Sequence, residues 1–525
     1  MNAQPSDVAD HQKSMKYSTY DGMFASAMDA LTSAFLSAFA LALGAGNVAI
    51  GLLSSAPQVL WTVNQFTGAW AVEKTGQRRK IVIISALASR LVWLPIAFLP
   101  FLFPGMTMLI LLVAISTMLG AFTGPAWASW MADIVPDNIR GEYFSKRNRM
   151  TALAGLIATL SAGLFLDIFP KGTTLGFTII FIIGVAAGIL SASFLRKIPE
   201  IPYAAVRGRF TESVGHALKN RRFKKFIAIY FLFRFGVMFG APFMVVDLIN
   251  NMNAAYIWIS ITAAASTVAG IMARGPVGKV SDLFGHRPVL IIGCIGTALT
   301  PLGWAFATSP EHIVFVNIIN GLAWAAADLA LFNYLLETSP REKRATYAAF
   351  FWVTMGIAAI VAPVAGGFYA DYMTGRELLG FHGLKAVFFI SFILRLAAGL
   401  LFWKFLEEVV EKREKARTAE VAQEMFRTGI HGGLHQMLYV KTGAKGAGKR
   451  VENIVEVIEK DVKKVAVAVE ERLEEMERGR RVSSYKIVEG AEKVQKDFTE
   501  SVERKRKQKP KEDSKNLKKP ESKKP

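Results

Sequence analysis

Twelve stretches of about twenty mostly apolar residues follow one another along the first 406 residues of the chain. A helix needs roughly 20 apolar residues to cross the hydrocarbon core of a bilayer, where it satisfies its own backbone hydrogen bonds. The pattern therefore predicts an all-α integral membrane protein with twelve transmembrane helices. The predicted spans are 23–45, 47–69, 81–103, 107–132, 150–168, 175–195, 226–248, 254–275, 288–308, 311–336, 346–370 and 384–406.

Charged residues are concentrated outside these spans. The chain has a net charge of +20, and residues 407–525 hold 30 of its 62 Lys and Arg and 23 of its 42 Asp and Glu. Such a net charge can indicate nucleic-acid binding. Most basic residues of the first 406 positions, however, lie in short loops between spans, where they set orientation in the membrane. We therefore expect a lipid bilayer and no nucleic acid as partner.

The basic residues are unevenly divided between the two sides. Even-numbered connections contain 23 Lys and Arg, whereas odd-numbered connections contain three. Positively charged loops stay in the cytoplasm, so both termini are predicted to be cytoplasmic in a multi-pass protein of the cell membrane. The predicted domains are a cytoplasmic segment 1–22, an N-terminal half 23–198, a cytoplasmic linker 199–225, a C-terminal half 226–406 and a cytoplasmic tail 407–525.

The two halves repeat one another at an offset of 204 residues. Seven identities fall at equivalent places, which predicts two pseudo-symmetric six-helix halves in parallel orientation. Transporters built from such repeats bind their solute between the repeats, near the bilayer midplane. The identities pair Pro136 with Pro340, Arg140 with Arg344, Tyr143 with Tyr347, Gly163 with Gly367, Asp167 with Asp371, Gly176 with Gly380 and Phe177 with Phe381.

The loops after the second and the eighth predicted spans have related sequences, each with glycine, a carboxylate and arginine. A glycine lets two helices approach closely, and a carboxylate at a helix end can cap backbone N–H groups and pair with arginine. We interpret these loops as a latch that joins the halves in one state and releases them in another; the alternative is a plain orientation signal. The predicted gating residues are Glu73, Gly76, Arg78, Arg79, Gly278, Asp282, Gly285, Arg287, Arg140 and Arg344.

The loop Gly278-Lys-Val-Ser-Asp282-Leu-Phe-Gly285-His-Arg287 resembles the signature loop of the major facilitator superfamily, Gly-x-x-x-Asp-x-x-Gly-x-Arg. The first copy departs from it, with Ala69 and Glu73 at the glycine and aspartate positions. The segment from Arg140 to Tyr143 is also similar to that family, and the resemblance covers residues 20–406.

The resemblance implies the fold of that family and a secondary active transporter. Such a protein moves a small solute by alternating access, driven by a proton or other solute gradient. No nucleophile–base or metal constellation appears in the predicted spans, so no enzymatic activity, catalytic residues, cofactor or metal is expected. The rival interpretation is a non-transporting membrane protein that anchors the tail as a binding or signalling element.

Asp29, Arg90, Arg234, Asp328 and Arg395 lie well inside the predicted spans, where an ionisable residue costs about 2.5–3.5 kcal/mol. Asp29 and Arg234 hold nearly equivalent places, on helices that face the central cavity in the resembled family, so we predict that they pair across it. Arg90 and Arg395 lie on helices that are peripheral in that family, where bonding to backbone carbonyls is one role and function another. Asp328 has three open roles: proton coupling, structure and solute binding.

Two spans carry a polar stripe at helical spacing. A polar stripe does not face lipid, so both stripes are predicted to point inward, with interhelical hydrogen bonding as the alternative. The stripes comprise Asn317, Asn320, Trp324 and Asp328 in the tenth span, and Ser116, Gly120, Thr123 and Trp127 in the fourth. The candidate substrate-binding or ion-binding residues are Asp29, Arg234, Asn320, Trp324, Asp328 and Trp127.

The tail reads as two charged helices, 405–427 and 451–478, and a disordered end. It either packs on itself or a protein partner, or it lies on anionic lipids. The stretch from Gly443 to Arg450 nearly fits a phosphate-binding loop, but Arg450 replaces the Ser or Thr that holds Mg²⁺. ATP is therefore not expected.

Overall fold

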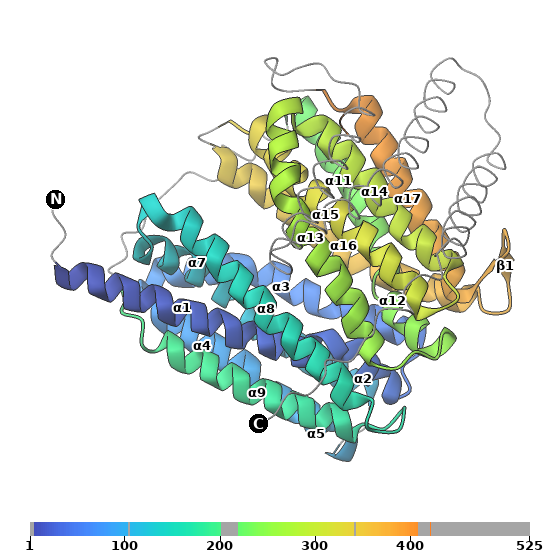
Figure 1. Ribbon diagram of the computed structural model, residues 1–525, viewed down its shortest axis with the longest axis horizontal. Helices are drawn as coiled ribbons and strands as arrows, with labels where there is room; N and C mark the ends of the chain where they lie inside the picture. Colours follow the sequence, from blue (N-terminus) through green and yellow to red (C-terminus); the bar gives the residue numbers. More distant parts are fainter. Residues whose placement is uncertain (1–4, 103–104, 201–218, 341–342, 408–420, 422–525) are drawn as a thin grey trace, which may run out of the picture. The chain divides into compact units, whose positions relative to one another are not determined.

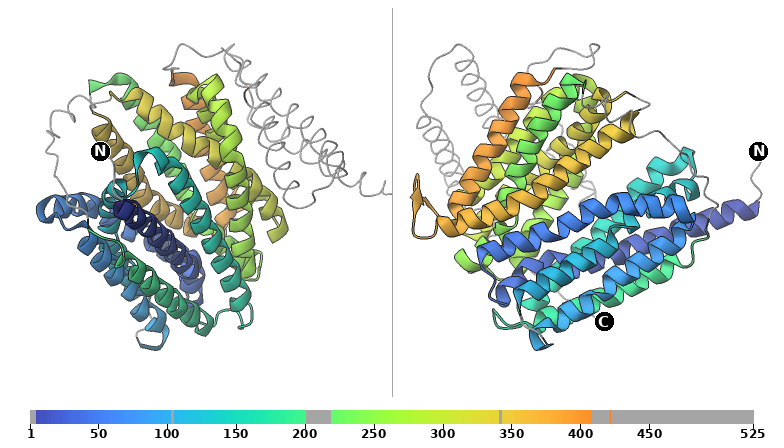
Figure 2. Two further views of the ribbon diagram at one scale, coloured as in Figure 1. Left: turned by 60° about the vertical axis from the view of Figure 1, so that its left-hand side comes forward. Right: turned by 180° about the vertical axis from the view of Figure 1, so that it is seen from behind.

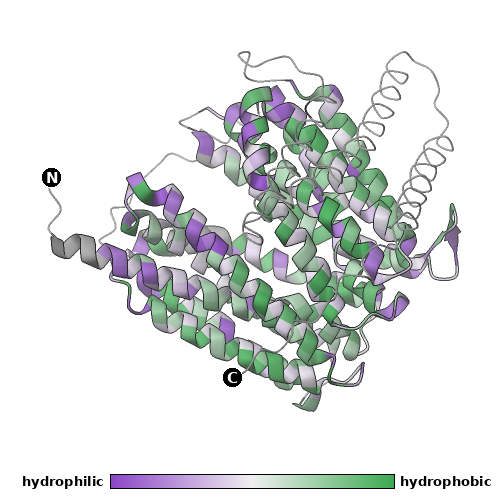
Figure 3. Ribbon diagram, viewed as in Figure 1, coloured by the Kyte–Doolittle hydropathy of each residue, from purple (hydrophilic) through white to green (hydrophobic). Residues whose placement is uncertain are grey.

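The structure is a computed structural model that describes residues 5–102, 105–200, 219–340, 343–407 and 421. All the described helices belong to one compact unit, Met1–Glu414. Hydrophobic residues predominate along these helices (Figure 3). The predicted tail helices and the phosphate-loop-like stretch fall outside the described residues, as does most of the linker.

The N-terminal half consists of helices that run back and forth (Figure 1). Its first helix begins at Pro5, so the segment predicted to precede the membrane is largely helical. The elements are α1 (Pro5–Leu31), η1 (Ser33–Phe35), α2 (Leu36–Ala42), α3 (Asn47–Thr75), α4 (Arg78–Leu91), α5 (Trp93–Leu102), α6 (Met106–Gly120), α7 (Thr123–Ile134), η2 (Asp137–Ile139), α8 (Arg140–Leu166) and α9 (Leu175–Leu195).

The C-terminal half repeats this order, with a short hairpin before its last helix. In the hairpin, Glu377 pairs with His382 across two antiparallel strands. The elements are α11 (Arg221–Gly240), α12 (Phe243–Val246), η3 (Asp247–Asn251, a π-helix), α13 (Ile257–Phe284), α14 (His286–Phe306), α15 (Pro310–Thr338), α16 (Arg344–Tyr372), β1 (Glu377–Leu378), β2 (Phe381–His382) and α17 (Gly383–Phe405).

The prediction of a twelve-helix membrane fold is confirmed. Within the described residues, 11 helical segments are long and apolar enough to cross a membrane. The remaining predicted span, the second one at 47–69, is α3, a helix of 29 residues that carries polar side chains such as Gln58 and Asn64. It packs along α16 of the other half, so part of its surface is not available to lipid (Figure 2).

Prolines divide three of the predicted spans into two helices. A proline has no N–H to donate to the carbonyl four residues earlier, so the helix breaks just before it. Pro95 follows the break between α4 and α5, Pro125 that between α6 and α7, and Pro242 that between α11 and α12.

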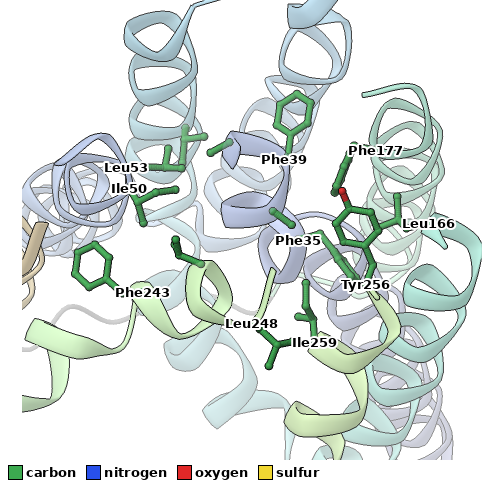
Figure 4. Close-up of a cluster of buried hydrophobic side chains, with 14 of the residues drawn as sticks. Phe35, Phe39, Ile50, Leu53, Leu166, Phe177, Phe243, Leu248, Tyr256 and Ile259 are labelled. Carbon is green, nitrogen blue, oxygen red and sulfur yellow. The ribbon is translucent and has the colours of Figure 1, made fainter. Parts of the chain in front are cut away.

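The two halves meet in a cluster of buried hydrophobic side chains (Figure 4). Phe35 and Phe39 come from the N-terminal half, and Phe243, Leu248 and Tyr256 come from the C-terminal half. Burying apolar surface stabilises such a contact by about 25 cal/mol per Å² where water would otherwise reach it.

Candidate functional site

Two aspartates at equivalent positions join the halves at one end of the helices. Asp167 accepts hydrogen bonds from the backbone N–H groups of Tyr256 and Ile257, at 2.6 and 3.0 Å, and so caps the start of α13. Asp371 accepts a hydrogen bond of 2.9 Å from Nδ2 of Asn47, the first residue of α3. A carboxylate at a helix N-terminus is also favoured by the helix dipole.

Two glycines related by the same offset bring the backbones close. A Cβ atom added at Gly163 would lie 2.9 Å from the Cα of Ile257, and one at Gly367 would lie 3.0 Å from the Cα of Val48. Both distances are too short for a side chain, so the close approach of α8 to α13 and of α16 to α3 requires glycine.

Further hydrogen bonds between the halves gather at this same end. Lys171 Nζ donates to the carbonyl and side-chain oxygens of Asn253, both at 2.6 Å, and Ser260 Oγ donates to the carbonyl of Thr159 at 2.7 Å. We call this end the joined end. We call the other the basic end, because it carries the basic connections after α3, α7 and α13.

At the basic end, the first motif forms bonds within its own half. Arg78 is fully buried, and its Nη1 donates to Asp133 Oδ2 at 2.6 Å and to the carbonyl and hydroxyl oxygens of Ser129 at 3.0 and 3.1 Å. Glu200 Oε2 accepts from the backbone N–H of Arg79 at 2.7 Å. These contacts tie α4 to α7 and to the residues that follow α9.

The second motif also forms hydrogen bonds within its own half, with different partners. Arg287 donates to the carbonyls of Leu406 and Trp403, both at 2.7 Å. Gly285, which follows the last residue of α13, has φ +96°. Its counterpart Gly76 has φ +66°, so each motif needs a glycine to end its helix. Asp282 is exposed and forms no hydrogen bond or ion pair within the described chain.

The close helix approach expected at the glycine of the second motif is not made in this conformation and stays a prediction. A Cβ atom at Gly278 would meet only Leu329 Cδ1, at 3.9 Å, so no close helix approach depends on this glycine here. Arg140 donates to the carbonyls of Ala132 and Val135 at 2.7 and 3.3 Å, and Arg344 is exposed. The side chain of Glu73 lies outside what the structure describes.

A charged network lies inside the N-terminal half. Asp21 is buried on α1 and accepts a hydrogen bond from Ser191 Oγ. Arg90 Nη2 lies 4.0 Å from Asp21 Oδ1, and Arg147 Nη2 lies 3.8 Å from Asp21 Oδ2. Arg90 also donates to the carbonyl of Gly188 at 2.7 Å, which confirms the predicted bond to a backbone carbonyl.

Trp127 borders this network. The guanidinium carbon of Arg147 lies 4.5 Å from the centre of the Trp127 ring, a cation–π contact. The buried indole N–H of Trp127 finds no acceptor among the described residues.

The predicted Asp29–Arg234 pair does not form. Asp29 is exposed on α1 and lies within electrostatic range of Arg90. Arg234, on α11, instead places its guanidinium carbon 5.7 Å from the centre of the Trp324 ring. No ion pair joins Asp29 to Arg234 in the described part of the chain, because each faces neighbours of its own half.

Trp324 and Asp328 lie one turn apart on α15, near Arg234. Asp328 is exposed and within electrostatic range of both Arg234 and Arg274, without an ion pair to either among the described residues. Behind them, the buried Arg395 donates from Nη1 to the carbonyl of Thr297 at 3.0 Å. The carbonyl-bonding role predicted for Arg395 is confirmed.

Residues of both polar stripes form hydrogen bonds between helices, which was the alternative to a role in a central site. Asn320 accepts a hydrogen bond from Thr300 Oγ1 at 2.9 Å and donates to Ser266 Oγ at 3.1 Å, so it links α15 to α14 and α13. In the fourth span, Ser116 Oγ donates to the carbonyl of Ser89 at 2.9 Å. Thr123 Oγ1 lies 2.8 Å from Ser85 Oγ, so this stripe faces α4 rather than the other half.

Sequence reasoning missed Asp21, Arg147 and Asp133. Asp21 fell into the segment placed before the membrane, although no proline or glycine interrupts residues 6–21, and this continuity was a usable signal. Asp133 directly follows the fourth predicted span, and a charged residue at the end of a span is expected without a functional reason. Its equivalent at the 204 offset is Glu337, which lies 3.5 Å from His286 Nε2.

Comparisons with known proteins agree with this architecture. A family model described as Major Facilitator Superfamily matches residues 22–253 and again residues 226–446. The D-xylose transporter of Levilactobacillus brevis is 28% identical over 152 residues, which is 29% of this chain and 33% of the relative. The class B tetracycline resistance protein of Escherichia coli is 25% identical over 155 residues, 30% of this chain and 36% of the relative.

The chain thus spans about a third of the length of these two curated relatives. Solved structures align over more of their length. The nucleoside transporter NupG has a TM-score of 0.59 at 15% identity, covering 76% of this chain and 99% of NupG. A D-xylose-proton symporter has a TM-score of 0.57 at 17% identity, with 77% and 99% covered. At these identities the likeness concerns the fold alone.

Proposed function

The chain belongs to the major facilitator superfamily, and we propose that it is a secondary active transporter of the cell membrane. It moves a small solute by alternating access between its two halves. The distribution of basic loops supports cytoplasmic termini, with the basic end facing the cytoplasm. The lipid bilayer and the solute are its partners in this proposal.

The observation that carries the proposal is the pair of clamps at the joined end. Asp167 and Asp371 each hold the start of a helix in the opposite half. The clamps are a few polar bonds and close glycine approaches, so breaking them costs a few kcal/mol, in addition to the cost of separating the buried hydrophobic cluster between the halves. An interface of this kind suits a gate that opens once in each transport cycle.

The motif at the basic end fits the complementary role. Asp282 forms no bond within the described chain, and Gly278 has no close neighbour in the other half. We interpret this state as closed toward the outside, with the cytoplasmic latch released. In the opposite state, the latch would form and the clamps would break.

Proton coupling is part of the proposal, with Asp328 as the proton carrier. A carboxylate within a span and without an ion pair can take up a proton on one side and release it on the other. Asp328→Asn should abolish accumulation driven by a pH gradient and preserve solute exchange at equal pH. Loss of both activities in folded protein would contradict this role.

A cysteine cross-link tests alternating access directly. The chain has one cysteine, so Cys294→Ala gives a background without thiols. In it, Asn47→Cys with Asp371→Cys should form a cross-link that stops solute uptake into liposomes, and reduction should restore uptake. The matched control is Ser85→Cys with Thr123→Cys, which joins helices of one half and should leave uptake unchanged.

The outcome also separates transport from an anchoring role for the tail. Full uptake in the cross-linked Asn47/Asp371 variant would refute alternating access across this interface. A chain that ends at Glu414 should still transport solute, whereas a protein that only anchors its tail would lose its function with the same truncation.

A further inference from the structure

The ionisable side chains within the two halves are balanced in one and unbalanced in the other. In the N-terminal half, Asp21 and Asp29 face Arg90 and Arg147. In the C-terminal half, Asp328 is the carboxylate within electrostatic range of Arg234 and Arg274, and Arg395 lies within range of Arg234. The described residues around Trp324 therefore carry more positive than negative charge.

Arg234 differs from the other arginines inside the spans. Arg90 and Arg395 both donate to backbone carbonyls of neighbouring helices. Arg234 forms no hydrogen bond or ion pair within the described chain, and its Nε is buried without an acceptor. Its guanidinium makes a cation–π contact with Trp324, and the guanidinium carbon lies 5.7 Å from the centre of that ring.

Arg234 is half-buried, and its guanidinium has no hydrogen-bond acceptor among the described residues, so its N–H groups are available to a ligand that supplies a negative charge. Guanidinium groups present N–H donors in a planar fork that matches a carboxylate or a phosphate. The Trp324 ring beside the fork adds an apolar surface. Arg395 donates to backbone carbonyls, and Asp328, the carboxylate within electrostatic range of Arg234, is shared with Arg274, so the positive charge near Arg234 is only partly offset.

We infer that the transported solute is an organic anion, whose carboxylate or phosphate group binds the guanidinium of Arg234 while its apolar part contacts Trp324. This inference names the substrate class of the proposed transporter and so rests on the proposed function. In the described part of the N-terminal half, Arg90 and Arg147 are already paired with Asp21, so they offer no equivalent site.

A thermal-stability screen of the purified full chain tests the inference with matched probes. The probes are benzoate and benzamide, succinate and succinamide, glucose 6-phosphate and glucose, and the cation benzylamine. At least one acid should raise the melting temperature more than its neutral partner. Arg234→Gln should weaken binding of that acid about 10- to 100-fold, and Arg234→Lys should weaken it less.

The control variant is Arg221→Gln, which removes the same charge from an exposed position on the same helix and should leave the affinity unchanged. Stabilisation by neutral or cationic probes only would overturn the inference. So would acid binding that Arg234→Gln leaves intact, or no stabilisation by any probe.

Uptake by liposomes separates the two proposals. If an acid binds through Arg234 but does not cross the membrane in counterflow, the transport proposal fails, and only an anion-binding site at Arg234 is supported. If a neutral probe is transported and the acids are not, transport stands and the anion inference fails.

Discussion

Asp167 and Asp371 lie 204 residues apart, and each accepts a hydrogen bond from the residue at the start of a helix in the opposite half. Asp167 bonds the backbone at Tyr256 and Ile257, and Asp371 bonds the side chain of Asn47. The repeat therefore places the same carboxylate on both sides of the interface. Because each clamp reaches across to the other half, the state of the gate depends on both halves.

The clamps should set the balance between the two conformations. Asp167→Ala or Asp371→Ala should each favour the outward-open state by about 1.5 kcal/mol, roughly tenfold, because charged hydrogen bonds at a helix start are lost. Thr62 on α3 lies against Gly356 on α16, across the interface between the halves. The measurement is labelling of Thr62→Cys, in the Cys294→Ala background, by a membrane-impermeant maleimide added outside. Unchanged labelling rates in both variants would show that the clamps do not hold the gate.

The glycines at the joined end should tolerate no side chain. Gly163→Ala and Gly367→Ala should each destabilise this conformation by about 1–3 kcal/mol, because the new methyl group meets backbone atoms of the opposite half. Gly141→Ala is the control, since an added Cβ there meets nothing within 4 Å. Melting temperature and maleimide labelling check this, and equal behaviour of all three variants would contradict it.

The buried arginine of the first motif should matter more for stability than its acidic partner. Arg78→Gln should lower the free energy of unfolding by about 3–5 kcal/mol, because Asp133 and Ser129 lose the buried guanidinium that donates to them. Asp133→Asn should cost about 1–2 kcal/mol, since that side chain is 46% exposed and Ser129 still accepts from Arg78. Unfolding of the purified protein measures both, with exposed Arg149→Gln as a near-neutral control.

A buried ion pair in the C-terminal half should behave as one unit. Asp247 is fully buried, and Lys385 Nζ lies 2.9 Å from its Oδ2. Lys385→Met should cost about 3–5 kcal/mol, because Asp247 remains buried and unpaired. The double variant with Asp247→Asn should cost less than the sum of the two single changes. Additive costs would mean that the pair is not coupled.

The distribution of basic residues predicts the orientation of the chain in the membrane. Reporters fused after residues 75 and 205 should report the cytoplasm, and reporters near residues 172 and 376 should report the outside. An outside signal at residue 75 would invert the assignment of the clamps to the outer gate.

The amino-acid sequence by itself determined the spans, the repeat and the glycine-containing motifs. These features are local: apolar length, loop charge and residue spacing can be counted without knowing what packs against what. The prolines did not mark by themselves which spans are divided, because Pro57, Pro276 and Pro363 lie inside continuous helices.

Only the tertiary structure decided which side chains meet. Asp29 and Arg234 hold equivalent places in the sequence, yet Arg234 turns to Trp324 and Asp29 lies near Arg90. Asn320 shares a stripe with Trp324 but bonds to two neighbouring helices. The rotation of a helix about its axis and the identity of its neighbours come from packing over the whole bundle, and no local pattern contains them.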